Sequence, residues 1–295
     1  MKRSLIILLT PLLLAACSSG GPVSLADTHV HGLAVDRGDS NRLYLATHNG
    51  LYVLTHSASS GQASDKDLTL VGRSRDDFMG FSPNPIDPNI LFSSGHPKGG
   101  GNLGFLKSMD EGTTWEKINN ADPIGPADFH AMMVHPANPD HIYGWYKLRV
   151  HRSLDQGKTW EVLPKQPPEV LAFAGDPRDD RILYIGSIGD LLQSTDRGES
   201  FVAIAPELKK DVVFDLEVEE ESGNLILATR DHGFMRVSRN VEGGFVFETL
   251  GELPASDLPY YLALDPKNPK VMYAFSKTHV LYKSTDGAKT WQKIL

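Results

Sequence analysis

The apolar positions of this chain recur in short runs that alternate with polar turns. Six comparable runs begin at His31, Met79, His130, Leu171, Asp215 and Tyr260, and read HGLAVD, MGFSPNP, HAMMVHP, LAFAGDP, DLEVEEE and YYLALDP. Further strand-length runs follow each of them, and no long helical period interrupts the series. Short strands separated by Asp, Pro, Asn and Gly turns are typical of an all-β fold.

One polar turn recurs four times, at residues 108–115, 153–160, 194–201 and 284–291, as SMDEGTTW, SLDQGKTW, STDRGESF and STDGAKTW. Its Asp can accept backbone N–H groups within the turn, and its Gly can take a positive φ. The turns resemble Asp-boxes, the S-x-D-x-G-x-T-W (BNR) repeats of sialidase-like and sortilin-like β-propellers. The last copy has Ala288 where the pattern has Gly, so we expect that turn to be distorted.

The aligned runs are spaced by roughly 40–50 residues, which is the period of a four-stranded propeller blade. The chain therefore predicts a six-bladed β-propeller with Asp-box turns, in a single domain over residues 27–295. The first and fifth blades lack a recognisable box, in the stretches THSASSGQAS and SRNVEGGF.

The N-terminal residues have a different character. Lys2 and Arg3 precede the apolar run LIILLTPLLLAA, which is short for a membrane span, and the run ends at Cys17. The string LAAC resembles the lipobox of bacterial lipoproteins. This implies a signal peptide over residues 1–16, acylation of Cys17 and a tether over residues 17–26. An ordinary secretory signal is the alternative.

The lipobox resemblance also predicts the location of the protein. We expect a cell-envelope lipoprotein bound to the membrane through Cys17. Ser18, rather than Asp, follows the cysteine. In a bacterium with two membranes this favours the outer membrane, facing the periplasm.

Composition limits the chemistry. Cys17 is the only cysteine, which excludes both a disulfide framework and a thiolate metal site. A formal net charge of −8 gives no electrostatic case for nucleic-acid binding.

The predicted fold gathers histidines from separate blades. In a propeller, the inner strands begin and the second strands end on the same face of the disc. Blades one to three therefore bring five side chains to one half of the channel mouth, namely His31, His48, Met79, His96 and His130, with His29 on the rim. Imidazole and thioether ligands without thiolate suit copper, and three imidazoles also suit zinc. We predict that these residues form a transition-metal site, with copper as the preferred ion. The alternative is that each imidazole caps a strand end or binds water in the channel.

Two carboxylates accompany these histidines. Asp77 and Asp128 lie two residues before Met79 and His130, in the similar strings DFMGF and DFHAM. We expect each carboxylate to orient an imidazole through a hydrogen bond, without itself binding the metal. Storage, delivery or sensing of the metal is expected rather than catalysis.

The other half of the mouth is predicted to bind a small anionic ligand or an envelope protein partner, through Asp215, Arg230, Tyr260 and Lys277. The sialidase resemblance raises a glycoside hydrolase as an alternative. It implies an arginine triad, a Tyr/Glu nucleophile pair and an acid, whereas Arg230 is the one arginine at this mouth. Glu217 and Glu219 alternate with Asp215 along FDLEVEEE, and the latter part of that run is expected to be a solvated turn. A non-enzymatic scaffold that binds protein on its face is the third possibility.

Overall fold

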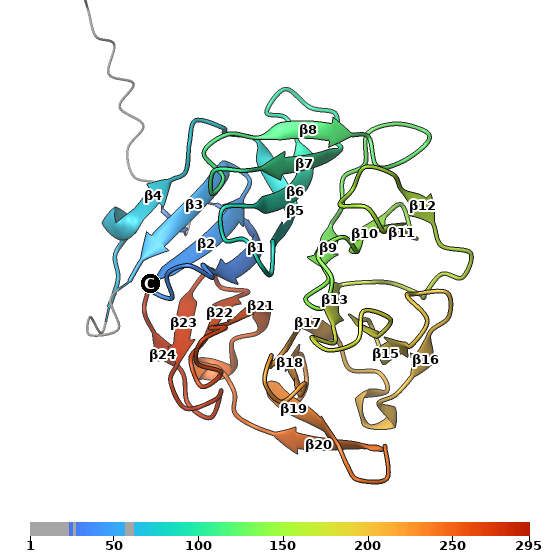
Figure 1. Cartoon of the computed structure of the whole chain (residues 1–295). Helices are drawn as coiled ribbons and strands as arrows, with labels where there is room; N and C mark the ends of the chain where they lie inside the picture. The colour runs from blue at the N-terminus through green and yellow to red at the C-terminus, as the bar shows by residue number, and fades with distance from the viewer. Residues whose placement is uncertain (1–23, 26–27, 57–61) are drawn as a thin grey trace, which may run out of the picture.

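The computed structural model describes residues 24–25, 28–56 and 62–295, which form a six-bladed β-propeller around a central channel (Figure 1). The all-β, six-bladed prediction is confirmed. The signal peptide, Cys17 and most of the tether lie outside the described residues, so their roles stay predictions. Within the described residues, no helix is long and apolar enough to cross a membrane.

Each blade is an antiparallel sheet of four consecutive strands. Blade 1 contains β1 (Val30–Val35), β2 (Arg42–Thr47), β3 (Gly50–Thr55) and β4 (Leu68–Leu70). Blade 2 contains β5 (Asp77–Pro83), β6 (Leu91–His96), β7 (Phe105–Ser108) and β8 (Glu116–Asn119). Blade 3 contains β9 (Ala131–Val134), β10 (Ile142–Tyr146), β11 (Arg149–Ser153) and β12 (Glu161–Val162).

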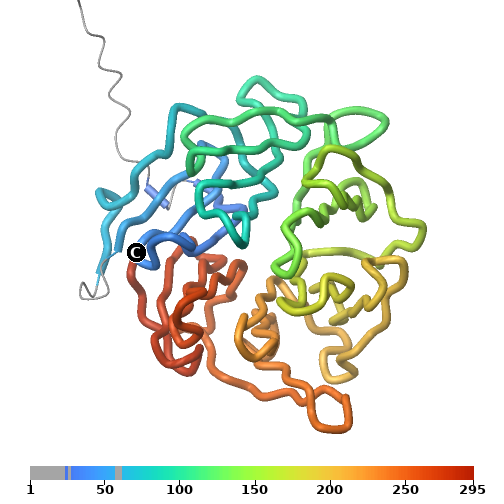
Figure 2. Tube along the Cα trace, viewed as in Figure 1, coloured from blue at the N-terminus to red at the C-terminus, as the bar shows by residue number. Residues whose placement is uncertain are grey.

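The second half of the disc repeats this plan, as the colour order in Figure 2 shows. Blade 4 contains β13 (Ala172–Gly175), β14 (Leu183–Gly186), β15 (Leu191–Ser194) and β16 (Val202–Ala203). Blade 5 contains β17 (Val213–Val218), β18 (Leu225–Thr229), β19 (Phe234–Arg239) and β20 (Phe245–Thr249). Blade 6 contains β21 (Pro259–Leu264), β22 (Met272–Ser276), β23 (Leu281–Ser284) and β24 (Gln292–Lys293). Short 3₁₀ turns span Asp65–Asp67, Pro206–Leu208 and Pro254–Ser256.

The hydrophobic core is divided among the six interfaces between blades. Phe92 and Phe105 of blade 2 pack with Phe129 and Ile142 of blade 3, for example, and all four are fully buried. Burial of one such side chain contributes about 2–3 kcal/mol. The second strands of the blades are almost wholly buried and carry nearly continuous apolar runs, whereas the fourth strands are largely exposed.

The ring closes by packing between the first and last blades. Tyr52 and Leu54 of blade 1 share a core cluster with Phe275 and Leu281 of blade 6. The backbone N–H of Ala63 also donates to the carbonyl of Ile294 at 2.7 Å, beside the C-terminus (Figure 1). Blades 1 and 6 therefore meet by side-chain packing and single hydrogen bonds, with each sheet complete in itself.

The Asp-box turns have the predicted local chemistry. In the second box Asp155 Oδ1 accepts the backbone N–H of Thr159 at 2.8 Å, and Gly157 N–H donates to Ser153 Oγ at 2.8 Å. Gly157 has φ 81°, a conformation that favours glycine. All four boxes join the third strand of a blade to the fourth, on the face opposite the mouth where His48 and His96 lie at the ends of the second strands.

The expected distortion of the last box is wrong. Ala288 N–H donates to Ser284 Oγ at 3.0 Å, and Asp286 Oδ1 accepts the N–H of Thr290 at 2.9 Å, as in the other boxes. Ala288 adopts φ 65° to do so, and its methyl group is fully buried between blades 5 and 6. Burial of that methyl group offsets part of the cost of the left-handed backbone.

Candidate functional site at the channel mouth

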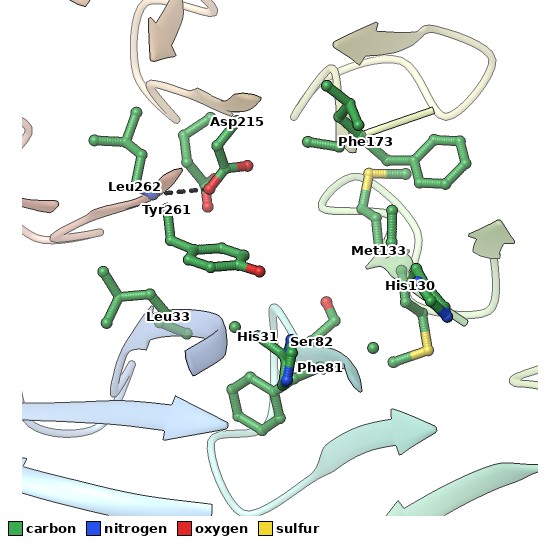
Figure 3. Close-up of a pocket in the computed structure, with 18 of the residues that line it drawn as sticks. His31, Leu33, Phe81, Ser82, His130, Met133, Phe173, Asp215, Tyr261 and Leu262 are labelled. Carbon is green, nitrogen blue, oxygen red and sulfur yellow. Dashed lines mark hydrogen bonds between the residues drawn. The ribbon is translucent and has the colours of Figure 1, made fainter. Parts of the chain in front are cut away.

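In five of the six blades, the residue predicted from the sequence to begin the inner strand lines the central channel. A cavity of about 130 Å³ occupies the channel, and its lining includes His31, Met79, His130, Leu171 and Asp215. Figure 3 shows His31 and His130 on one side of this cavity and Asp215 across from them. The predicted convergence of imidazoles from separate blades is therefore present.

Blade 6 differs from the alignment by one residue. Tyr261, not Tyr260, lines the channel (Figure 3). The pairing of β21 with β22 shifts register between Pro259 and Tyr261, as the inner-strand pairings of blades 1 and 5 do between Val30 and Gly32 and between Val213 and Asp215. Tyr260 lies beside the channel in the wall of an adjoining cleft and is 36% exposed.

Three residues form the tightest cluster at the mouth. His31, His48 and Asp77 each offer one ligand atom, and these atoms lie within 4.8 Å of one another. His48 Nδ1 contacts Asp77 Oδ2, and His31 Nε2 lies 3.7 Å from Asp77 Oδ1. His31 Nε2 and Asp77 Oδ1 are both buried and have no hydrogen-bond partner. His29 is exposed on the rim, with its ring centroid 5.2 Å from that of His48.

The environment of His31 keeps its ring neutral. Burial, together with the neighbouring His48 imidazole, lowers the pKa of His31 to about 4. A neutral imidazole carries a free lone pair, which is the form that binds a metal ion. The strand end thus presents a neutral imidazole whose Nε2 has no hydrogen-bond partner.

A second pair of imidazoles lies in the next blade. His96 Nε2 and His130 Nε2 lie 2.8 Å and 3.0 Å from the same oxygen of Asp128, Oδ2. The hydrogen bond with Asp128 raises the pKa of His130. Asp77 and Asp128, which we expected to orient the imidazoles, thus contact them directly.

The predicted cationic half of the mouth is dispersed. The Arg230 guanidinium pairs with Asp231 at 2.7 Å and donates to the Lys210 carbonyl. Lys277 is exposed, and neither it nor Arg230 lines the channel or the adjoining cleft. The structure therefore does not group these two cations with Asp215 and Tyr260 in the lining of the channel or the cleft.

The channel contains two carboxyl groups instead. Asp215 Oδ2 accepts the N–H of Leu262 at 2.8 Å, which connects blades 5 and 6 (Figure 3). Burial raises the pKa of Asp215 to about 7, and burial together with Asp215 raises that of Glu217 to about 8. Glu217 belongs to β17 and lines the channel, whereas the latter part of the acidic run, at Glu220 and Glu221, is an exposed turn as expected. The two-residue alternation from Asp215 was the signal for this placement. Glu219 is also buried and accepts hydrogen bonds from Arg236.

An apolar cleft adjoins the channel on the side of blades 3 to 6. Its volume is about 650 Å³, and it shares His31, Met79, His130, Leu171 and Tyr261 with the channel. Its other residues are Trp145, Tyr146, Lys147, Leu148, Glu169, Val170, Phe214 and Tyr260, of which only Tyr260 was a predicted site residue. The aromatic end of β10, in the string GWYKL, was the available signal.

The comparisons with known proteins establish the fold. No model of a known protein family matches the chain. A probable oligoxyloglucan-reducing end-specific xyloglucanase of Neosartorya fischeri is 27% identical over 168 residues, covering 49% of this chain and 19% of that protein. Xyloglucanase Xgh74A of Acetivibrio thermocellus is 27% identical over 194 residues, covering 53% and 22%. The chain thus spans about a fifth of the length of these relatives.

Solved structures match over nearly the whole chain. The GH74 xyloglucanase of Xanthomonas campestris has a TM-score of 0.62 at 19% identity, covering 91% of this chain and 45% of that one. YCF48 bound to D1 peptide has a TM-score of 0.56 at 15% identity, covering 91% and 81%. These proteins share the propeller; membership of the sialidase-like or sortilin-like families stays a resemblance carried by the Asp-box turns.

Proposed function

We propose that the channel mouth binds a transition-metal ion through His31, His48 and Asp77. The observation that carries this proposal is the pair of buried, unpartnered atoms, His31 Nε2 and Asp77 Oδ1, which face one another at 3.7 Å. A buried polar atom without a partner costs about 1–3 kcal/mol, and a bound cation would remove that cost at both atoms.

The ligand types indicate which ions fit. Two imidazoles and a carboxylate suit Zn²⁺ and Cu²⁺, and the thioether of Met79 in the same cavity favours copper. Together with the predicted lipid anchor at Cys17, this describes a cell-envelope protein that stores, delivers or senses a metal.

The test is metal retention by the full-length chain. The protein is purified in detergent, stripped with a chelator, loaded with Cu²⁺ or Zn²⁺, desalted and analysed for metal. We expect bound metal that survives desalting and falls by about one ion per chain in His48→Gln. His232→Gln is the matched control, because His232 pairs with Asp211 at 2.7 Å and is 42% exposed, like His48. Absence of retained metal in the unaltered protein refutes the proposal.

The comparisons support a second candidate better than they support metal binding. Both curated relatives are named as xyloglucanases. The cleft is lined by aromatic rings of the kind on which sugar rings pack, including Tyr146, Phe214 and Tyr260. Asp215 and Glu217, with raised pKa values, supply two carboxyl groups, which glycoside hydrolysis requires. This supports a glycoside hydrolase acting at the mouth.

The two candidates are separated by substitutions that leave the other site intact. Incubation with xyloglucan oligosaccharides, followed by measurement of new reducing ends, tests hydrolysis. A hydrolase that uses the channel carboxyl groups would lose turnover in Glu217→Gln and keep it in His48→Gln. Absence of turnover in the unaltered protein over a panel of glycans excludes this candidate and leaves the metal proposal in place.

A further inference from the structure

Two of the histidines at the mouth have no polar partner among the residues that the structure describes. The rings of His29 and His279 contact other aromatic rings, and neither forms a hydrogen bond or an ion pair with a described residue. By contrast, the two imidazoles of the candidate metal site pair with Asp77, and the two of the next blade pair with Asp128. An unpaired imidazole near the surface has a ring nitrogen available to an ion that arrives from solvent.

These two rings extend the candidate metal site outward as a row of imidazoles. The ring centroid of His29 lies 5.1 Å from that of His279 and 5.2 Å from that of His48. The next step, from His48 to His31, is 4.3 Å. The exposed fraction of the side chain falls from 42% at His48 to 16% at His31. The row therefore leads from the outer surface to the buried Nε2 of His31.

The row is assembled from two neighbouring blades. His29 precedes β1 and His48 follows β2, and the backbone N–H of His48 donates to the His29 carbonyl at 3.2 Å. His279 comes from the turn between β22 and β23 of blade 6, which packs against blade 1. Its backbone N–H donates to the Ser276 carbonyl at 3.0 Å, and its φ is 61°, in the left-handed region. Backbone hydrogen bonds thus hold the rim histidines beside His48.

The distances fit the passage of an ion. Two imidazoles bound to one tetrahedral ion, with nitrogen–ion distances of about 2.0–2.1 Å, have ring centres about 5 Å apart. The spacings at His29 have this size, so rotation of the side chains lets either neighbouring pair hold an ion while water fills the other positions. Within the described part of the chain, only His31, His48 and Asp77 bring three such ligand atoms within 4.8 Å of one another. The row therefore has one resting site, at its inner end.

A buried site needs such a path. His31 Nε2 and Asp77 Oδ1 are both buried, so a hydrated ion must exchange its water for protein ligands before it reaches them. Imidazoles along the way divide this exchange into steps. Once the first ring has captured the ion, transfer to the next ring is intramolecular and benefits from a high effective concentration.

We propose that His29 and His279 capture the metal ion at the rim and pass it to the site formed by His31, His48 and Asp77. At each step one nitrogen–metal bond forms, one bond to water or to the preceding imidazole breaks, and the ion keeps its charge. This inference deepens the proposed metal-binding function and rests on it.

The test compares the rates of metal binding and release with the amount of metal bound. Stripped full-length protein in detergent is mixed rapidly with Cu²⁺, and binding is followed by quenching of tryptophan fluorescence, since Trp145 lines the cleft that shares His31. Release is followed after addition of excess EDTA. We expect both rates to fall by about tenfold in the double variant His29→Gln, His279→Asn, because capture no longer precedes transfer. Residues on a path change the barrier and not the end states, so one ion per chain should stay bound after desalting.

The substitutions are chosen to keep the fold. Asn adopts the positive φ of position 279 more readily than most residues do. Unchanged thermal unfolding midpoints of the stripped proteins verify that the variants are folded. His232→Gln is the matched control and should keep both rates, because His232 also lies between the second and third strands of its blade but pairs with Asp211.

The other outcomes separate the two proposals. No bound metal in the unaltered protein refutes the proposed function and this inference with it. Unchanged rates in the double variant refute the entry path alone and leave the metal site in place. Loss of bound metal without a change in the binding rate makes His29 or His279 a resting ligand, which also refutes the path.

Discussion

Replacement of Glu217 by Gln is expected to stabilise the propeller at high pH and to leave it unchanged at low pH. Glu217 lies in β17 with its carboxyl group in the channel, beside Asp215 and near Arg37 and Glu220. Burial and the Asp215 charge raise its pKa from the ordinary 4.5 to about 8. The folded state therefore binds this proton more tightly than the unfolded chain does.

The sign and size of the effect follow from linkage. A raised folded-state pKa contributes stability that is fully present below pH 4.5 and is lost as the pH rises through about 8. The difference between the pKa values of 4.5 and about 8 corresponds to about 5 kcal/mol of folding free energy, because each tenfold change in proton affinity is worth about 1.4 kcal/mol. Glu217 is only partly buried, so solvent screens part of this difference and we expect about 2–3 kcal/mol. Gln resembles the protonated Glu in shape and does not ionise.

The assay is urea unfolding of the unaltered protein and Glu217→Gln at pH 5 and pH 9. The variant should gain about 2–3 kcal/mol relative to the unaltered protein at pH 9 and less than about 1 kcal/mol at pH 5. Glu221→Gln, in the exposed turn that follows β17, is the control and should show no such change. An equal difference between Glu217→Gln and the unaltered protein at both pH values would falsify the reasoning.

Three further outcomes are expected. Gly157→Ala should destabilise the protein by about 3 kcal/mol or more in urea unfolding, because φ is 81° and a Cβ would lie 2.0 Å from Phe105 Cε1. The control is Gly125→Ala, which should be neutral because no atom lies within 4 Å of the added Cβ. Equal effects of the two substitutions would contradict this account. The double variant Lys147→Asn, Leu148→Gly should stabilise the folded protein by about 1 kcal/mol, because Lys147 and Leu148 have positive φ angles of 50° and 58° in a two-residue hairpin turn. A lower unfolding midpoint in the double variant would refute the conclusion that the turn is strained. Metal at 100 times its dissociation constant should add about 2.7 kcal/mol per ion, visible as a rise of about 5–10 °C in the unfolding midpoint, and an unchanged midpoint would argue against binding to the folded state.

The apolar pattern of the inner strands predicted most of the channel lining. His31, Met79 and His130 line the channel as predicted, because a one-residue change of register would turn the apolar side chains of the strand away from the core. The alignment failed in blade 6, where Tyr261 lines the channel instead of Tyr260; the register shift found there also occurs in blades 1 and 5, so it does not distinguish blade 6. The sequence did not single out Glu217 as a channel residue, because it stands at the start of an acidic run whose latter part is an exposed turn.

The sequence by itself determined the repeat, since the Asp-box hydrogen bonds are local and the strand period is written in the apolar pattern. It also determined which blades carry histidines toward the mouth. The tertiary structure alone decided that Asp77 and Asp128 each contact two imidazoles, and that Arg230 is neutralised by Asp231. Those pairings depend on how neighbouring blades are rotated about the channel and on side-chain rotamers, and neither is encoded in local spacing.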